Sequence, residues 1–270
     1  MVLAIEKIRT HLFTSLMMNR EEIVSIFFYA TPEAFRRHLI NILTMNDFDY
    51  GDDLFPGGMS PENGEEKTLC VFLLDSSGSM SGNHKINLLN AGLNQFYDDI
   101  LANESLSQRV EVAVISFAST FNYLQQPALV QDFKMPTLTA SGGTDMVGGI
   151  RKALEVIEER KAYWNEHGVS YKRPWIVMIT DGYANVDSIV AEVKQGSKDK
   201  HFFFLPIAVD DNSDMNVLNS IASEQAFKLK DGNRFSEFFQ WLSNSIQLIA
   251  NAEPGKPVEL ENPFGAFAAS

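Results

Sequence analysis

Three short segments of the chain carry carboxylate and hydroxyl side chains at spacings that could bind a metal ion. Residues 75–79 read Asp-Ser-Ser-Gly-Ser, residues 141–145 read Ser-Gly-Gly-Thr-Asp, and residues 180–182 read Thr-Asp-Gly. All three segments supply oxygen donors, and none supplies a nitrogen or sulfur donor. Oxygen donors suit hard divalent cations, so we expect Mg²⁺ rather than Zn²⁺, with Mn²⁺ or Ca²⁺ as substitutes.

The candidate metal ligands in these segments are Asp75, Ser77, Ser79, Thr144 and Asp181. The two carboxylates would balance the charge of a divalent ion, while the hydroxyls would add only dipoles. Mg²⁺ takes about six oxygen ligands and usually keeps several waters. Such a site therefore has room for one more anionic oxygen, which an Asp or Glu of another protein could supply.

These segments need a scaffold that brings them together, and the apolar pattern of the chain indicates one. Short apolar runs alternate with amphipathic segments from residue 68 onward. The runs predict strands and the amphipathic segments predict helices. The expected strands lie at residues 68–74, 110–117, 121–130, 175–180, 202–209 and 227–229, and the expected helices at 86–101, 146–164, 188–194, 215–223 and 235–249.

The repeated alternation of strands and helices indicates an α/β fold. We expect a three-layer, doubly wound, Rossmann-like α/β/α arrangement, in which a mostly parallel sheet lies between two layers of helices. Residues 121–130 are expected as an antiparallel or edge strand. Ligands of such sheets bind at the carboxyl ends of the strands, next to the point where the strand order reverses. We therefore expect the oxygen-rich segments to meet at that edge.

The composition divides the chain into four parts. Residues 1–45 carry apolar side chains at helical spacing and predict a helical N-terminal extension. Residues 46–66 are acidic, contain no basic residue and include glycines and prolines, so they predict a linker. The acids of this linker lack the spacing of a calcium-binding EF-hand loop. The α/β domain is expected at residues 67–252, and a C-terminal tail at residues 253–270.

The overall composition excludes several classes of function. The chain has 270 residues, a formal net charge of −13 and a pI of about 4.8, without a cluster of basic residues. An acidic surface repels phosphate backbones, so we do not expect a nucleic-acid partner. No apolar run reaches the ~20 residues of a membrane span. The chain has a single cysteine, Cys70, which excludes a cysteine-rich zinc site. The single cysteine and the lack of a secretory pattern at the N-terminus together favour a cytoplasmic protein.

The oxygen-rich segments resemble the metal-ion-dependent adhesion site (MIDAS) of von Willebrand factor A (VWA) domains. The Asp-x-Ser-x-Ser pattern at 75–79, Thr144 and Asp181 match all positions of that motif in order. The resemblance implies that the two serines and Thr144 bind the metal directly, and that the two aspartates bind it directly or through water. It also implies a protein-binding module rather than an enzyme.

Longer stretches resemble the bacterial TerY/YegL type of VWA protein, which is associated with tellurium resistance and chemical stress. These stretches are residues 138–144, 173–182 and 235–243, and the likeness extends over roughly residues 68–260. The resemblance implies a stress-response or signalling complex, with kinase, phosphatase or Ter-type proteins as partners. Residues 1–66 have no counterpart in it.

The main alternative is a metal-dependent hydrolase or phosphatase that uses the same acidic site. Asp75 follows a strand as an aspartyl nucleophile would, but a haloacid-dehalogenase-type phosphatase needs a second acid at the position of Ser77. Ser79 lacks the Gly-x-Ser-x-Gly context of a nucleophile elbow. A triad with Ser79 would require His84 to turn back from the start of a helix. We therefore expect a binding protein, and the sequence leaves the enzymatic alternative open.

Other carboxylates near the expected site allow two interpretations each. Asp145 either adds charge at the rim of the metal site or stabilises the start of the following helix. Asp210, Asp211 and Asp214 follow the strand expected at 202–209. We interpret them as a loop and a helix cap, with a second cation site as the alternative.

Overall fold

The computed structural model describes residues 64–182, 184–210, 213–229 and 233–253, together with residues 258 and 260. The helical extension predicted at residues 1–45 lies outside this part of the chain. Most of the predicted linker and most of the predicted C-terminal tail lie outside it as well. The boundaries given to these parts therefore stay predictions.

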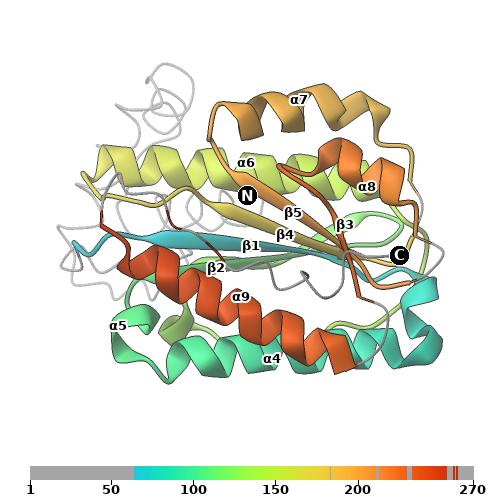
Figure 1. The fold of residues 1–270 in the computed structure, drawn as a ribbon, viewed down its shortest axis with the longest axis horizontal. Coiled ribbons are helices and arrows are strands. Elements are labelled where there is room, and N and C mark those ends of the chain that lie inside the picture. The colour runs from blue at the N-terminus through green and yellow to red at the C-terminus, as the bar shows by residue number, and fades with distance from the viewer. Residues whose placement is uncertain are drawn as a thin grey trace, which may run out of the picture. The chain divides into compact units, whose positions relative to one another are not determined.

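A six-stranded sheet in the order β3-β2-β1-β4-β5-β6 forms the centre of the described domain (Figure 1). Every neighbouring pair is parallel except β2 and β3, which are antiparallel. The mostly parallel sheet and the antiparallel edge strand are thus confirmed. The strands are β1 (Thr68–Asp75), β2 (Val110–Phe117), β3 (Phe121–Leu129), β4 (Trp175–Thr180), β5 (Phe203–Ala208) and β6 (Phe227–Lys228).

Helices cover both faces of the sheet, which confirms the three-layer α/β/α class (Figure 1). One face carries α6 (Met146–Glu166), α7 (Asp187–Lys198) and α8 (Met215–Ile221), and the other carries α4 (Lys85–Leu101), α5 (Glu104–Ser107) and α9 (Asn233–Asn251). The sequence pattern did not predict α5 or the 3-10 helices η2 (Gly78–His84) and η3 (Val130–Asp132). These elements are short, so they show no hydrophobic periodicity. Among the described residues, no helix has the length and apolar character needed to cross a membrane.

The alternation of side chains along β1 divides the hydrophobic core into two layers. Every residue of β1 is buried, because helices cover both faces of the sheet. This double burial explains why the strand is a continuous apolar run in the sequence. Cys70, Phe72 and Leu74 join the core layer on the α4 and α9 side, and Leu69, Val71 and Leu73 join the layer on the α6 side.

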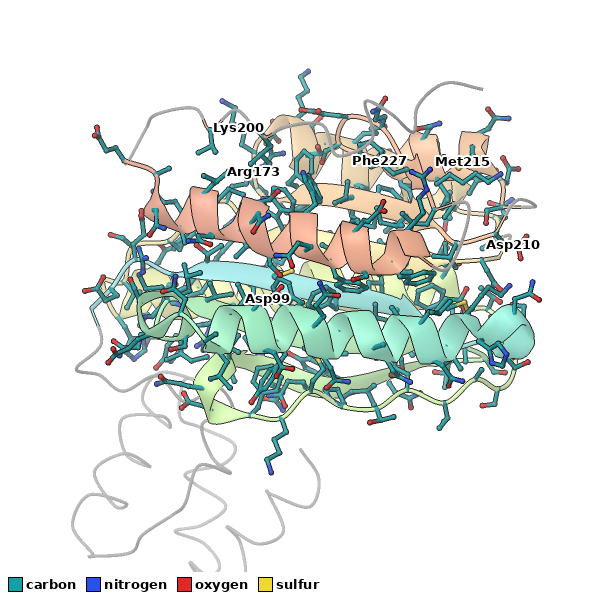
Figure 2. All side chains as sticks on the ribbon, turned by 60° about the horizontal axis from the view of Figure 1, so that its bottom comes forward. Asp99, Arg173, Lys200, Asp210, Met215 and Phe227 are labelled. Carbon is teal, nitrogen blue, oxygen red and sulfur yellow. The ribbon has the colours of Figure 1, made fainter. Side chains whose placement is uncertain are left out.

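Helices α4 and α9 pack closely on their face of the sheet (Figures 1 and 2). A Cβ atom on Gly92 of α4 would lie 2.0 Å from the ring of Phe239 on α9, so only glycine permits this approach. The Ser236 hydroxyl donates a hydrogen bond to the Gln95 side chain across the same contact, at 2.9 Å. The packing fixes the position of α4, and so of its first residue, Lys85.

The strand order reverses between β1 and β4, which lie side by side in the middle of the sheet. The chain leaves β1 toward α4 on one face and leaves β4 toward α7 on the other face (Figure 1). The carboxyl ends of β1 and β4 are therefore the switch point at which doubly wound sheets bind ligands.

Candidate metal centre

Asp75 is the last residue of β1 and is fully buried. Its Oδ1 accepts a hydrogen bond from the Ser77 backbone N–H at 2.8 Å, and its Oδ2 accepts one from the Thr180 hydroxyl at 2.6 Å. Burial raises the pKa of Asp75 above its ordinary value; these hydrogen bonds oppose the rise and the charge of Asp181 adds to it. The ionised carboxylate is therefore costly here unless a cation balances it.

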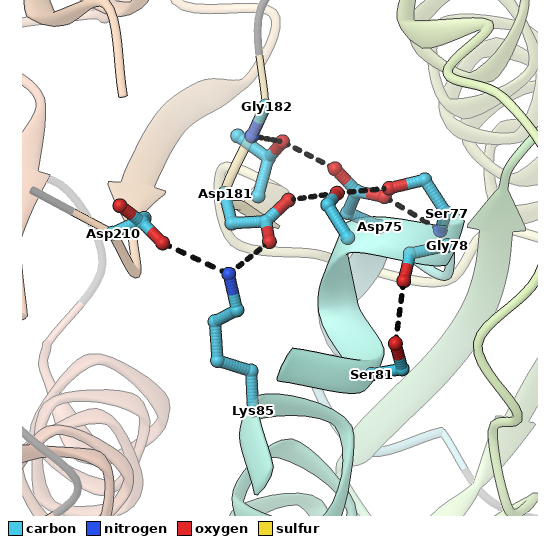
Figure 3. A network of polar contacts seen from close by, with 10 residues as sticks. Asp75, Ser77, Gly78, Ser81, Lys85, Asp181, Gly182 and Asp210 are labelled. Carbon is cyan, nitrogen blue, oxygen red and sulfur yellow. Dashed lines mark hydrogen bonds and ion pairs between the residues drawn. The ribbon is translucent and has the colours of Figure 1, made fainter. Parts of the chain in front are cut away.

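A chain of hydroxyl groups connects this region to Asp181 (Figure 3). The Oγ atoms of Ser77 and Ser79 are 2.9 Å apart, and the Ser79 hydroxyl donates to Asp181 Oδ1 at 2.7 Å. Asp181 directly follows β4, and its side chain is only 1% exposed. The structure thus joins four of the candidate ligands in one polar network across the switch point.

Thr144 lies beside this network. A Cβ atom on Gly182 would lie 3.5 Å from Asp75 Oδ2 and 3.8 Å from Thr144 Oγ1, so both oxygens are close to the same point. The loop that carries Thr144 is tied to the loop after β1 by backbone hydrogen bonds. The Gly78 N–H donates to the Gly142 carbonyl at 3.0 Å, and a second bond joins Ser141 to Ser76. All candidate ligands are therefore brought to one edge of the sheet.

The turn before Thr144 depends on a glycine and on a serine that the sequence pattern did not single out. Gly142 has a φ of +78°, a conformation that favours glycine. The Ser119 Oγ accepts a hydrogen bond from the Gly143 N–H at 2.8 Å, and it would lie 2.7 Å from a Cβ atom on Gly142. Ser119 therefore orients this loop and leaves no room for a side chain at Gly142.

Lys85 supplies a cation that the sequence analysis missed. Its ammonium group donates hydrogen bonds to Asp181 Oδ2 and to Asp210 Oδ2, the latter at 2.9 Å (Figure 3). Burial alone would lower the pKa of Lys85, but the bonds to these carboxylates and their charges outweigh it, so the pKa is raised. A lysine at the first residue of a helix is opposed by the helix dipole. That unfavourable position is the sequence signal that could have indicated an acidic partner.

The structure shows the hydrogen bonds and exposure of the remaining candidates that it describes. Asp145 caps α6, because its Oδ1 accepts a hydrogen bond from the Gly148 N–H at 2.9 Å. Asp214 caps α8 through the backbone N–H groups that follow it. His84 is exposed and has a left-handed φ of 57°. The helix-cap interpretations of Asp145 and Asp214 are therefore confirmed, and His84 does not turn back toward Ser79; Asp211 lies outside the described residues.

The donor set fits a hard divalent cation. Within the described residues, no three His, Cys, Asp or Glu side chains form a metal-binding group by themselves. A metal ion at this edge would therefore need the hydroxyls of Ser77, Ser79 and Thr144 beside the two aspartates. Hydroxyl and carboxylate oxygens are the ligands of Mg²⁺, Mn²⁺ and Ca²⁺. The buried, destabilised charge of Asp75 is what such an ion would balance.

Residues 70–241 match the family described as von Willebrand factor type A domain. The match covers more than half of the chain, and the doubly wound sheet agrees with it. The chain therefore belongs to the von Willebrand factor type A family, whose members are known as metal-dependent protein-interaction modules.

Several known proteins are similar to this chain. Human calcium-activated chloride channel regulator 4 is 29% identical over 154 residues, which cover 54% of this chain and 15% of that protein. The pilus adhesin SpaC from Lactobacillus rhamnosus GG has a TM-score of 0.55 and 13% identity, and covers 68% of this chain and 31% of that chain. The corresponding domain of the type V pili tip protein Mfa5 from Porphyromonas gingivalis has a TM-score of 0.53 and 13% identity, and covers 72% of this chain and 99% of that chain.

Proximal thread matrix protein 1 from the mussel byssus has a TM-score of 0.50 and 17% identity, and covers 69% of this chain and 47% of that chain. At such identities, the solved structures show the shared fold alone. The chain spans less than half the length of the human protein, of SpaC and of the mussel protein.

Proposed function

We propose that this VWA domain binds partner proteins through a divalent metal ion at the carboxyl ends of β1 and β4. The observation that carries the proposal is the polar network from Asp75 through Ser77 and Ser79 to Asp181, with Thr144 beside it. The network consists of oxygen donors, and it lies at the switch point of a doubly wound sheet.

In this proposal Mg²⁺ is the resident ion, and Mn²⁺ or Ca²⁺ can replace it. Ser77, Ser79 and Thr144 bind the ion directly, whereas Asp75 and Asp181 bind it directly or through water. The ion supplies a positive charge that attracts one carboxylate of the partner. The residues of the chain hold the donors in place, since Thr180 engages Asp75 Oδ2 and both oxygens of Asp181 accept hydrogen bonds.

We further propose that the domain extends over residues 67–252 and acts in a cytoplasmic stress-response complex of the TerY/YegL type. Kinase, phosphatase or Ter-type proteins are the proposed partners. The support is the resemblance of residues 138–144, 173–182 and 235–243 to that type. Cys70 adds to it, because a buried free thiol suits a reducing compartment.

A hydrolase or phosphatase at the same site has less support. The Ser79 hydroxyl pairs with Asp181 and Ser77, and both oxygens of Asp75 accept hydrogen bonds from neighbouring groups. His84 is exposed, so a serine-histidine pair has no support in this geometry. A serine nucleophile that is activated by histidine needs that histidine within hydrogen-bond reach. The arrangement therefore favours binding over catalysis.

The experiment that tests the proposal compares partner binding with and without the ion. The full chain is used to capture partners in Mg²⁺, and binding of each purified partner is then measured by calorimetry in Mg²⁺ and in a chelator. We expect binding to be lost in the chelator and in Thr144→Val, which removes one hydroxyl outside the hydrogen-bonded chain. The control is Thr137→Val, at an exposed threonine before the loop. A partner that binds equally well in the chelator would contradict the proposal.

A further inference from the structure

The network around Asp181 contains a carboxylate and an ammonium group that do not belong to the metal-ligand pattern. Asp210 follows β5, and Lys85 begins α4. The Lys85 ammonium bridges Asp181 and Asp210, from positions 96 and 125 residues away in the sequence (Figure 3). Only the fold brings these groups together.

The three side chains of this bridge are largely shielded from water. The side chains of Lys85 and Asp181 are 9% and 1% exposed, and that of Asp210 is 23% exposed. Charges at such positions are weakly screened by salt and act on their neighbours through a medium of reduced dielectric constant. One unit of charge at Lys85 therefore has a large effect on a cation bound beside Asp181.

Within the described part of the chain, the formal charges of the four groups named in this network add up to the charge of one divalent ion with the opposite sign. Asp75, Asp181 and Asp210 contribute −3 and Lys85 contributes +1, which gives −2. Without the ammonium group the sum would be −3. A divalent ion would then leave excess negative charge, and this charge would repel a partner carboxylate.

We propose that Lys85 sets the charge of the metal centre: its ammonium group offsets one of the two carboxylates that it bridges, so that one divalent cation balances the four described groups and can still attract an acidic group. This inference rests on the proposed function. Lys85 is a positioning residue and no ligand of the ion. It acts through Asp181, whose Oδ2 it binds while Ser79 binds Oδ1.

The test measures the affinity of the full chain for Mg²⁺ alone by calorimetry. Lys85→Met changes the sum of charges to −3, and we expect it to bind Mg²⁺ at least about tenfold more tightly than the wild type. Asp210→Asn changes the sum to −1, and we expect at least about tenfold weaker binding. The double variant restores −2, so its affinity should return to within about threefold of the wild type.

The opposite signs separate a charge effect from a structural one, because loss of structure would weaken binding in both single variants. Asp210→Asn keeps the Lys85 to Asp181 bond, so unchanged affinity in this variant overturns the proposal even if Lys85→Met fails to fold. The control is Lys161→Met, since Lys161 pairs with Glu158 on α6 and lies four helical turns from the site. We expect its affinity to stay within about twofold of the wild type.

Three outcomes would overturn the inference. A wild-type chain that does not bind Mg²⁺ contradicts both this inference and the proposed function. A wild-type chain that binds Mg²⁺, with Lys85→Met folded and binding no more tightly, contradicts the inference alone. Asp210→Asn with unchanged affinity also contradicts the inference alone, because the third carboxylate would then have no effect on the ion.

Discussion

Two buried ionic networks in this domain differ in whether cations offset all of their carboxylates. Glu111 in β2 is fully buried, and both of its oxygens accept hydrogen bonds from Arg160 in α6, at 2.6 Å and 2.8 Å. The guanidinium group also lies against the rings of Tyr163 and Trp164. Arg160 thus satisfies both oxygens of the carboxylate, and the charge of the buried Lys67 also interacts with Glu111. The Glu111–Arg160 pair holds α6 on the sheet.

The network of Asp75, Asp181, Asp210 and Lys85 at the carboxyl ends of the strands is different. Glu111 is paired in register with Leu69, near the start of β1, whereas Asp75 ends the same strand. Among the residues that the structure describes, this network contains three carboxylates and one ammonium group. A matched pair inside the sheet stabilises the fold, while an excess of buried negative charge at the switch point retains the capacity to bind a cation. The following variants test this difference.

The largest effect on stability is expected when the Glu111–Arg160 pair is broken. Arg160→Met removes the cation that donates hydrogen bonds to both oxygens of the buried Glu111, and we expect the free energy of unfolding to fall by about 3–5 kcal/mol. The stabilisation of the domain by Mg²⁺ should not change, because the Glu111–Arg160 pair lies at the end of the sheet opposite to the candidate metal centre. Urea unfolding with and without Mg²⁺ measures both quantities.

Arg151→Met is the control for Arg160, because Arg151 is an exposed residue of the same helix. We expect the control to change the free energy of unfolding by less than about 0.5 kcal/mol. Equal effects of the two substitutions would show that the buried pair has no special role in the fold.

A smaller effect is expected at the unbalanced network, and it should depend on the metal. In a chelator, Asp75→Asn should change the free energy of unfolding by less than about 1 kcal/mol, because burial already makes the ionised Asp75 costly. Mg²⁺ at 100 times its dissociation constant should stabilise the wild type by about 2.7 kcal/mol and leave Asp75→Asn unchanged. Thermal and urea unfolding in Mg²⁺ and in a chelator measure the difference.

Asp187→Asn is the control for Asp75. Asp187 is an exposed residue in the first turn of α7 and is not one of the candidate ligands, so this variant should keep the full response to Mg²⁺. If Asp75→Asn is stabilised by Mg²⁺ as strongly as the control is, Asp75 is no part of the metal centre.

The smallest effect is expected at a carboxylate that belongs to a helix cap. Asp145→Ala removes the cap of α6 and should cost about 1 kcal/mol. Asp145→Asn keeps an oxygen acceptor and should lower the free energy of unfolding by only about a few tenths of a kcal/mol. Both variants should bind Mg²⁺ with less than about a threefold change in calorimetry. A larger loss of affinity in both would place Asp145 in the metal centre.

Most of the fold could be predicted because its signals are local. β2 and β4 coincide with the strands expected from the apolar runs, and α4 begins one residue before the expected helix. The hydrophobic pattern of such elements reflects burial on one or both faces. Helix ends were less predictable: α7 continues to Lys198 because its last turn has no distinct apolar signal.

The candidate site was predictable in part for a similar reason. Asp75, the serines after it and Asp181 form short motifs, and turn residues next to strands indicate the edge of a sheet. The roles of Thr180 and Ser119 were not predicted, because Thr180 ends a strand and Ser119 resembles an ordinary turn residue. Their roles appear only once Thr180 is seen to donate to Asp75 and Ser119 to accept from Gly143.

The sequence by itself determined the α/β class, the main strands and helices, and the set of oxygen donors at the strand ends. These depend on periodicity and on short motifs, which are properties of neighbouring residues. Only the tertiary structure decided which charges share one network. Lys85, Asp181 and Asp210 come from three separate elements, and the strength of their interaction depends on distance and burial, which no local pattern records.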